Sequence, residues 1–119
     1  MKTTKQQFQV FKKEFIRIQK KLGLMDWDVF FMHKDTKNAY ASIEADPSAM
    51  AATVFFSIDL PDYAKDDLKP KEHARHEAFH LLISKLEYLA RWRYINENQI
   101  YIECEAICNR LEEFMKESK

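Results

Sequence analysis

The chain has 119 residues, of which 46% are hydrophobic and 32% charged, and its 19 basic side chains balance 19 acidic ones to a net charge of zero. This length predicts a single domain over residues 1–119 that buries roughly two thirds of the surface of the unfolded chain. The composition excludes a disordered chain. No apolar run reaches the roughly 18 residues of a membrane span, and MKTTKQQFQV lacks the pattern of a secretory signal, so we expect a cytoplasmic protein.

The first predicted element is an amphipathic helix from Thr4 to about Leu22, with apolar residues at helical spacing and lysines on the other side. Gly23, the only glycine, follows at once and precedes Leu24. This order is typical of a helix that ends in a left-handed residue with a hydrophobic contact. Aromatic residues are not interleaved with the basic charges of residues 2–21, so we do not expect nucleic acid as a partner.

Three strands are predicted next, at residues 27–34, 39–45 and 51–60. Each is rich in β-branched and aromatic residues, and the turn-forming stretches DTKN and DPS separate them. We expect one small sheet. In the third strand apolar residues alternate with mixed ones, which favours a half-covered strand. We therefore predict that Ala51 to Leu60 forms the open edge of the sheet.

Two helices complete the chain. A polar connection over residues 61–71 leads into a helix from Pro70 to Ala90, and a last helix runs from about Asn98 to Met115. The short link between them predicts antiparallel packing. The predicted fold class is α+β with the order αβββαα. The two cysteines, Cys104 and Cys108, are four apart in a helical pattern that does not favour an internal disulfide, so we expect reduced thiols.

Residues 75–83 read RHEAFHLLI and place His76 and His80 one helical turn apart, with Glu77 beside the first. The two imidazoles project side by side, within reach of one zinc ion at a nitrogen-to-metal distance of ~2.0 Å. Glu77 is turned far enough away to lie beside the metal without binding it, where it can take a proton from a water molecule. The alternative is a chance pattern on a surface helix. The stripe predicted to face the core is Ala78, Phe79, Leu82, Leu86 and Leu89.

A catalytic zinc site needs a third protein ligand and an open position, and the last helix offers two acids. Its predicted apolar stripe is Ile100, Ile107, Leu111 and Phe114. Glu103 falls inside this stripe, whereas Glu105 falls outside it. A carboxylate on a core-facing stripe is costly unless it is paired or bound to a metal, so Glu103 is the predicted ligand and Glu105 the second choice. Alternatively, Glu103 forms an ion pair with Arg75 or Arg93.

HEAFH followed by ECEAICNR resembles the gluzincin zinc metallopeptidases, in which HExxH on one helix is completed by a glutamate on the next. ECEAICNR looks like the glutamate helix of the prenyl-protein-processing proteases, with Glu103 at the ligand position and Ala106 at the small residue. The order and length of the elements are similar to the minimal gluzincins, called minigluzincins. The metzincin pattern needs glycine and histidine where this chain has Ile83 and Leu86, so that family is excluded.

This resemblance implies a zincin-like fold that hydrolyses peptide bonds in a peptide or protein substrate with zinc-activated water. His76, His80 and Glu103 would hold Zn2+, and Glu77 would act as general base and then as proton donor. An open sheet edge would bind an extended peptide by strand addition. For the oxyanion of the transition state, Tyr94, Tyr101 and His73 are all available.

Two other functions are compatible with the sequence. A regulatory or protein-interaction module of the same fold would bind the metal without cleaving peptides. A helical adaptor would bind no metal and would hold an acidic partner on the basic face of residues 2–21.

Overall fold

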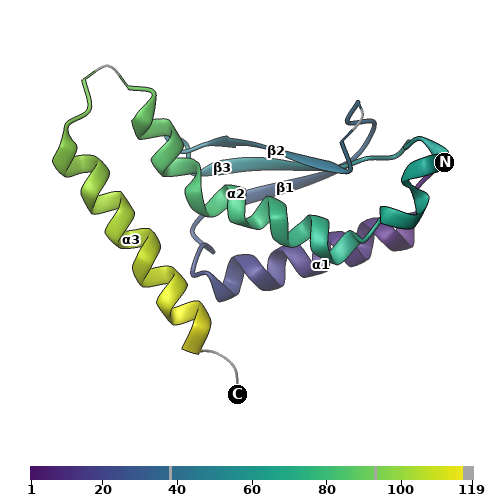
Figure 1. Ribbon diagram of the computed structural model, residues 1–119, viewed down its shortest axis with the longest axis horizontal. Helices are drawn as coiled ribbons and strands as arrows, with labels where there is room; N and C mark the ends of the chain where they lie inside the picture. The colour runs from purple at the N-terminus through teal and green to yellow at the C-terminus, as the bar shows by residue number, and fades with distance from the viewer. Residues whose placement is uncertain (38, 93, 117–119) are drawn as a thin grey trace.

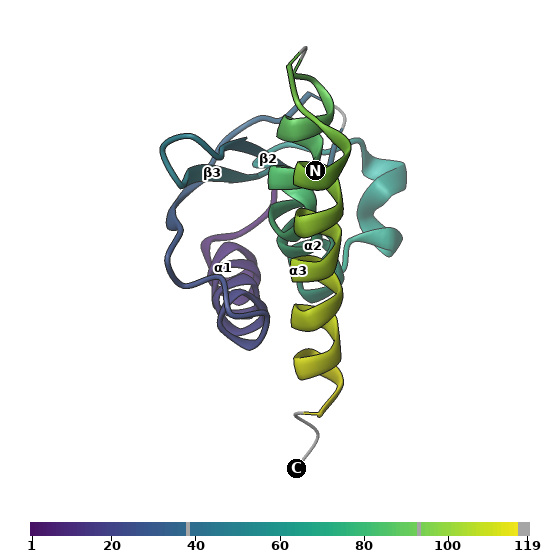
Figure 2. The same ribbon diagram turned by 90° about the vertical axis from the view of Figure 1, so that its left-hand side faces the viewer.

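The computed structural model describes residues 1–37, 39–92 and 94–116. Its elements are α1 (Lys5–Lys21), β1 (Asp28–His33), β2 (Ala41–Asp46), β3 (Ala51–Phe56), the 3-10 helix η1 (Asp62–Asp67), α2 (Pro70–Ala90) and α3 (Glu97–Lys116). Helices α1 and α2 pack together beneath one small sheet, and α3 runs back beside α2 (Figures 1 and 2). The predicted α+β class and element order are confirmed, whereas η1, inside the predicted polar connection, was not expected.

Helix α1 begins and ends with local hydrogen bonds that the sequence encodes. Thr4 and Gln7 form a reciprocal capping box at its start. At its end, Gly23 has φ 71°, and the N–H groups of Gly23 and Leu24 donate to Lys20 O (3.0 Å) and Gln19 O (2.9 Å). This is the left-handed helix end that the Gly-Leu pair predicts.

The sheet has the strand order β1-β3-β2, so β3 is its central strand. It pairs with β1 in parallel and with β2 antiparallel. The prediction that Ala51 to Leu60 forms the open edge is therefore wrong, and the strand ends at Phe56. Alternation along a strand reports that one face of the sheet is covered and the other is not. It carries no information on whether both neighbouring strands are present.

One face of the sheet carries the core. Val54 and Phe56 of β3 are fully buried there against Phe11 and Phe15 of α1. Residues of α2 close the same core, namely Ala74, Ala78, Leu81 and Leu82. On the opposite face, large apolar side chains such as Phe30 are exposed to solvent. In the part of the chain that the structure describes, helices therefore cover one face of the sheet and leave the other to solvent.

The face that α2 turns to the core agrees with the predicted stripe at Ala78 and Leu82 only. Leu86 and Leu89 are half-buried, and Leu81 and Ser84 are buried although they were not predicted. Phe79 is exposed instead of buried, while Glu77 is buried. Phe79 lies on the side of α2 that faces α3, where its ring meets Phe114 edge to face at 6.4 Å between centroids. The small residues Ala74 and Ala78 take the core positions, because they allow α2 to approach α1 and the sheet closely.

Helix α3 is held at its C-terminal half by contacts with the end of α1. Arg110 donates to the backbone carbonyls of Leu22 and Gly23, and the ammonium of Lys21 lies 4.2 Å from the centre of the Phe114 ring. None of the residues of α3 is fully buried. Among the described residues, no helix combines the length and the apolar character needed to cross a bilayer.

Candidate metal site on helix α2

The two histidines of HEAFH meet on the surface of α2. The Nε2 atoms of His76 and His80 are 3.2 Å apart, and the rings lie at 77° to each other. Two nitrogens bound to one tetrahedral zinc ion at ~2.0–2.1 Å are about 3.3 Å apart. The pair therefore already has the spacing of two ligands of one ion, while in the structure the two nitrogens lie at hydrogen-bond distance from each other.

Glu77, next to His76 in the sequence, is a largely buried acid at the edge of the pocket that His76 also lines. The Glu77 residue is 6% exposed. Burial raises the pKa of its carboxyl, and the charges of His80 and His76 act in the opposite direction and lower this pKa. Within residues 1–37, 39–92 and 94–116, no group donates a hydrogen bond to it or forms an ion pair with it. A carboxyl with a raised pKa accepts a proton more readily at neutral pH, which is what a general base requires.

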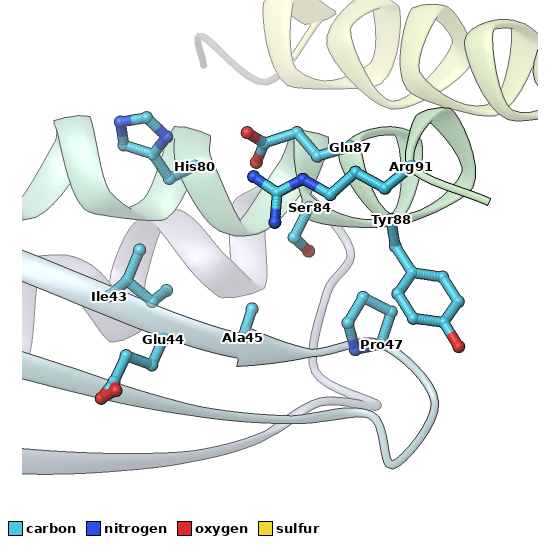
Figure 3. A pocket seen from close by; sticks show the side chains of 9 residues that line it. All are labelled: Ile43, Glu44, Ala45, Pro47, His80, Ser84, Glu87, Tyr88 and Arg91. Carbon is cyan, nitrogen blue, oxygen red and sulfur yellow. The ribbon is translucent and has the colours of Figure 1, made fainter. Parts of the chain in front are cut away.

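Two pockets lie along α2 on either side of the histidines, and both are bordered by β2 or the residues that lead into it. One, of about 570 Å³, is lined by Tyr40 and Ala41 on the strand side and by His76 and Glu77 on the helix side. The other, of about 440 Å³, lies between β2 and the C-terminal half of α2, with His80 at one end and Arg91 at the other (Figure 3). Together the two pockets lie along the β2 edge of the sheet, one on each side of the histidine pair.

The edge strand beside these pockets is β2. The Ser57 N–H donates to Tyr40 O at 2.9 Å, which fixes the phase of the antiparallel ladder. Residues of an antiparallel strand alternate between bonding to the neighbour and pointing away from it. Three residues of β2 therefore direct their N–H and C=O groups to the open edge, namely Ala41, Ile43 and Ala45. This edge can accept a further extended segment.

The structure does not bring Glu103 to the histidines. Glu103 is half-buried and Glu105 is exposed, so Glu103 does face inward as predicted. However, the residue of α3 that meets the HEAFH turn is Phe114, which contacts Phe79. Glu103 precedes Phe114 by eleven residues, or about 16 Å along a helix. In the part of the chain that the structure describes, no three His, Cys, Asp or Glu side chains form a metal-binding group.

Arg75, one of the two arginines predicted as alternative ion-pair partners of Glu103, pairs with a different acid. Arg75 donates from Nε to Glu14 Oε2 at 2.7 Å and is therefore committed to α1. Arg93 lies outside the described residues. The buried acid Glu14 was missed in the sequence, although its place among Phe11, Phe15 and Ile18 on the core-facing side of α1 is a usable signal.

The remaining histidines have structural contacts. His73 stacks on Tyr40 at 4.2 Å between centroids, accepts a hydrogen bond from Lys69 N, and has its pKa lowered by burial. His33 bonds to Thr3 Oγ1 at 2.7 Å and stacks on Phe8. Of the three candidate donors for an oxyanion, His73 lines the pocket that contains Glu77, whereas Tyr94 and Tyr101 are exposed elsewhere.

Comparison of the chain with protein-family models, with curated proteins and with solved structures finds no match. The assignment of a function therefore depends on the geometry of the site itself.

Proposed function

We propose that the protein is a zinc-dependent metallopeptidase with a zincin-like fold of the gluzincin type, acting on a peptide or protein substrate in the cytoplasm. The observation that carries the proposal is the His76–His80 pair at 3.2 Å, with the buried Glu77 next to it. Two imidazoles at ligand spacing and a carboxylate beside them would supply two of the three protein ligands and the general base that metal-assisted hydrolysis needs.

A zinc ion held by His76 and His80 would supply a Lewis acid that makes a water molecule acidic enough to attack a peptide carbonyl. Glu77 would take the proton of that water and return it to the leaving amine, a role that its buried position beside the histidines supports. The open edge of β2 would bind the substrate backbone by strand addition, in place of the edge first predicted at β3.

Glu103 remains the predicted third ligand, and it can reach the histidines only if α3 shifts along α2. Such a shift would have to break the packing of Ile107 and Phe114 against the core and the hydrogen bonds of Arg110 to the end of α1. Glu103 does not join His76 and His80 in a metal-binding group of the described residues. This favours one specific alternative, a regulatory or protein-interaction module that binds metal through His76 and His80 without turnover. The two proposals differ in whether Glu77 has a chemical role.

The first test is the metal content of protein purified without a histidine tag. We expect about one zinc per chain, and strong loss of zinc in His76→Ala and His80→Ala. His33→Gln is the matched control, because it removes an imidazole that bonds to Thr3 and stacks on Phe8, away from α2. Zinc absent after incubation and desalting, or lost equally in His33→Gln, would refute the site.

The second test separates the peptidase from the module. Glu77→Gln should keep the zinc and the fold but lower the cleavage of a quenched-fluorescence peptide library by about 10²-fold or more. Zinc-loaded wild-type protein that cleaves nothing would favour the module. Cleavage that is undiminished in Glu77→Gln would refute the mechanism.

A further inference from the structure

Strand β1 is the second edge of the sheet, on the side opposite β2. The Asp28 N–H donates to Met50 O at 2.9 Å, which fixes the phase of the parallel ladder with β3. Alternate residues of β1 bond to β3 in this ladder, and the others direct their N–H and C=O groups to the open edge, namely Val29, Phe31 and His33. In the described part of the chain, no hydrogen bond reaches these backbone groups. The edge can therefore accept a further strand.

Helix α1 places a line of lysines beside this edge (Figure 1). The Lys12 ammonium lies 5.6 Å from the centre of the Phe31 ring, and the Phe15 ring meets Phe31 edge to face at 5.4 Å between centroids. Lys5 precedes Lys12 by about two helical turns and so lies on the same side of α1. We define the basic edge as Lys5 and Lys12 together with the open backbone groups of Val29, Phe31 and His33.

The charge of the two lysines is not neutralised among the described residues. Glu14 is the only acid of α1, and it is buried and bonded to Arg17 and Arg75. Lys5 and Lys12 form no ion pair within residues 1–37, 39–92 and 94–116. An occupant of the basic edge should therefore present carboxylates toward α1.

The other side of an added strand would meet an apolar surface. Phe30 is 61% exposed and Met32 45%, and both lie on the uncovered face of the sheet. Successive side chains of a strand point to opposite faces. A strand on the basic edge would therefore place alternate side chains beside Phe30 and Met32, and the remaining ones toward the lysines. The segment that fits alternates apolar and acidic residues.

A second copy of this chain fits the basic edge less well. Antiparallel pairing of β1 with β1 of another copy would place both α1 helices on the same face of the joined sheet. The lysines of the two helices would then repel each other, with no acid between them. A nucleic acid would match the charge, but it has no peptide backbone to pair with the open N–H and C=O groups.

We propose that the basic edge binds an extended acidic segment of another protein by strand addition, and that this segment alternates acidic and apolar side chains. This proposal is independent of the metal site, because β1 and β2 are opposite edges of the sheet. A protein bound at β1 would leave the β2 edge and the His76–His80 pair accessible.

The test is fluorescence anisotropy of a labelled peptide of alternating valine and glutamate, with metal-free protein so that no cleavage occurs. The matched peptide has the same composition in two blocks, so it carries the same charge without the alternation. The alternating peptide should bind at least about 10-fold more tightly. Equal affinity of the two peptides, or no saturable binding of the alternating one up to about 1 mM, would overturn the proposal. Tighter binding of an oligothymidylate of equal length would also overturn it, in favour of a phosphate site.

The role of the lysines is tested by charge reversal. Lys5→Glu combined with Lys12→Glu should weaken binding of the alternating peptide at least about 10-fold. The matched control is Lys71→Glu combined with Lys85→Glu, because these lysines are exposed on α2 and the change in net charge is the same. Circular dichroism checks that each variant is folded. Equal weakening in both double variants would mean that only net charge matters, which contradicts the proposal.

Amide hydrogen exchange of the unmutated protein locates the bound peptide. The three N–H groups of the basic edge have no partner among the described residues, so they should exchange at least about 10-fold more slowly when the alternating peptide is bound. The open N–H groups of β2 serve as the internal reference and should keep their rates. Protection at β2 instead of β1 would mean that the peptide occupies the edge proposed for substrates, and would overturn a separate site at β1.

Discussion

Replacing Glu14 by glutamine should destabilise the protein and remove part of its pH dependence. The Glu14 residue is 6% exposed, and its carboxylate accepts two hydrogen bonds from Arg17 (2.9 and 2.8 Å) and one from Arg75 (2.7 Å). The hydrogen bond from Arg17 is the main cause that lowers its pKa from 4.5 to about 2, with a further lowering by Arg75 and an opposing effect of burial.

The magnitude follows from this difference in pKa. A change from 4.5 to about 2 corresponds to about 3.4 kcal/mol of stability at neutral pH. Both arginines are about half-exposed, so solvent screens the interaction, and we expect a loss of about 2 kcal/mol in Glu14→Gln. Because the pKa is lowered in the folded state, this contribution is complete above pH 4.5 and disappears as the pH falls toward about 2.

Urea unfolding of both proteins at neutral pH and again near pH 2 measures this effect. The difference in the free energy of unfolding should be large at neutral pH and should shrink at the acidic end. Glu44→Gln is the matched control, because Glu44 is exposed on the uncovered face of the sheet. Equal stability of Glu14→Gln and the wild type at neutral pH, or a difference that does not change with pH, would refute the reasoning.

Three further predictions concern the candidate site and the end of α1. In metal-free protein at neutral pH, Glu77→Gln should raise the thermal midpoint measured by calorimetry, because burial raises the pKa of the Glu77 carboxyl and so makes its charged form unfavourable in the folded state; a lower midpoint would contradict this. Glu103→Ala should reduce bound zinc far more than Glu105→Ala in elemental analysis, and equal effects would exclude Glu103 as the ligand. Gly23→Ala should cost about 1–2 kcal/mol in urea unfolding, since alanine is strained at φ 71° and its Cβ would lie 3.1 Å from an Arg110 nitrogen; an unchanged stability would contradict the strain.

Local chemistry made the helices predictable. The helix from Pro70 to Ala90 begins and ends as predicted, because proline fits the first turn and no breaker follows within it. The end of α1 is encoded equally directly by Gly23 and Leu24. These signals involve residues that are close together in the sequence, so they do not depend on how distant segments of the chain pack.

The order of the strands and the offset between helices were not predictable in the same way. The position of β3 between β1 and β2 depends on pairing between distant segments, which alternation does not encode. Likewise, the 3.6-residue period correctly turns Glu103 inward, but it cannot say how far α3 slides along α2. That offset is set by the contact of Phe114 with Phe79 and by the hydrogen bonds of Arg110 to the end of α1.

The place of β3 in the sheet also determines when the sheet can form during synthesis. β1 and β2 do not pair with each other, so neither has a neighbour until Phe56 has been made. At about 5–20 residues per second, β1 waits roughly 1–5 s after His33 is added. Throughout that time the aromatic segment Asp28–His33 has no strand beside it. Slower translation of residues 34–56 would lengthen the time for which this segment lacks its strand partner.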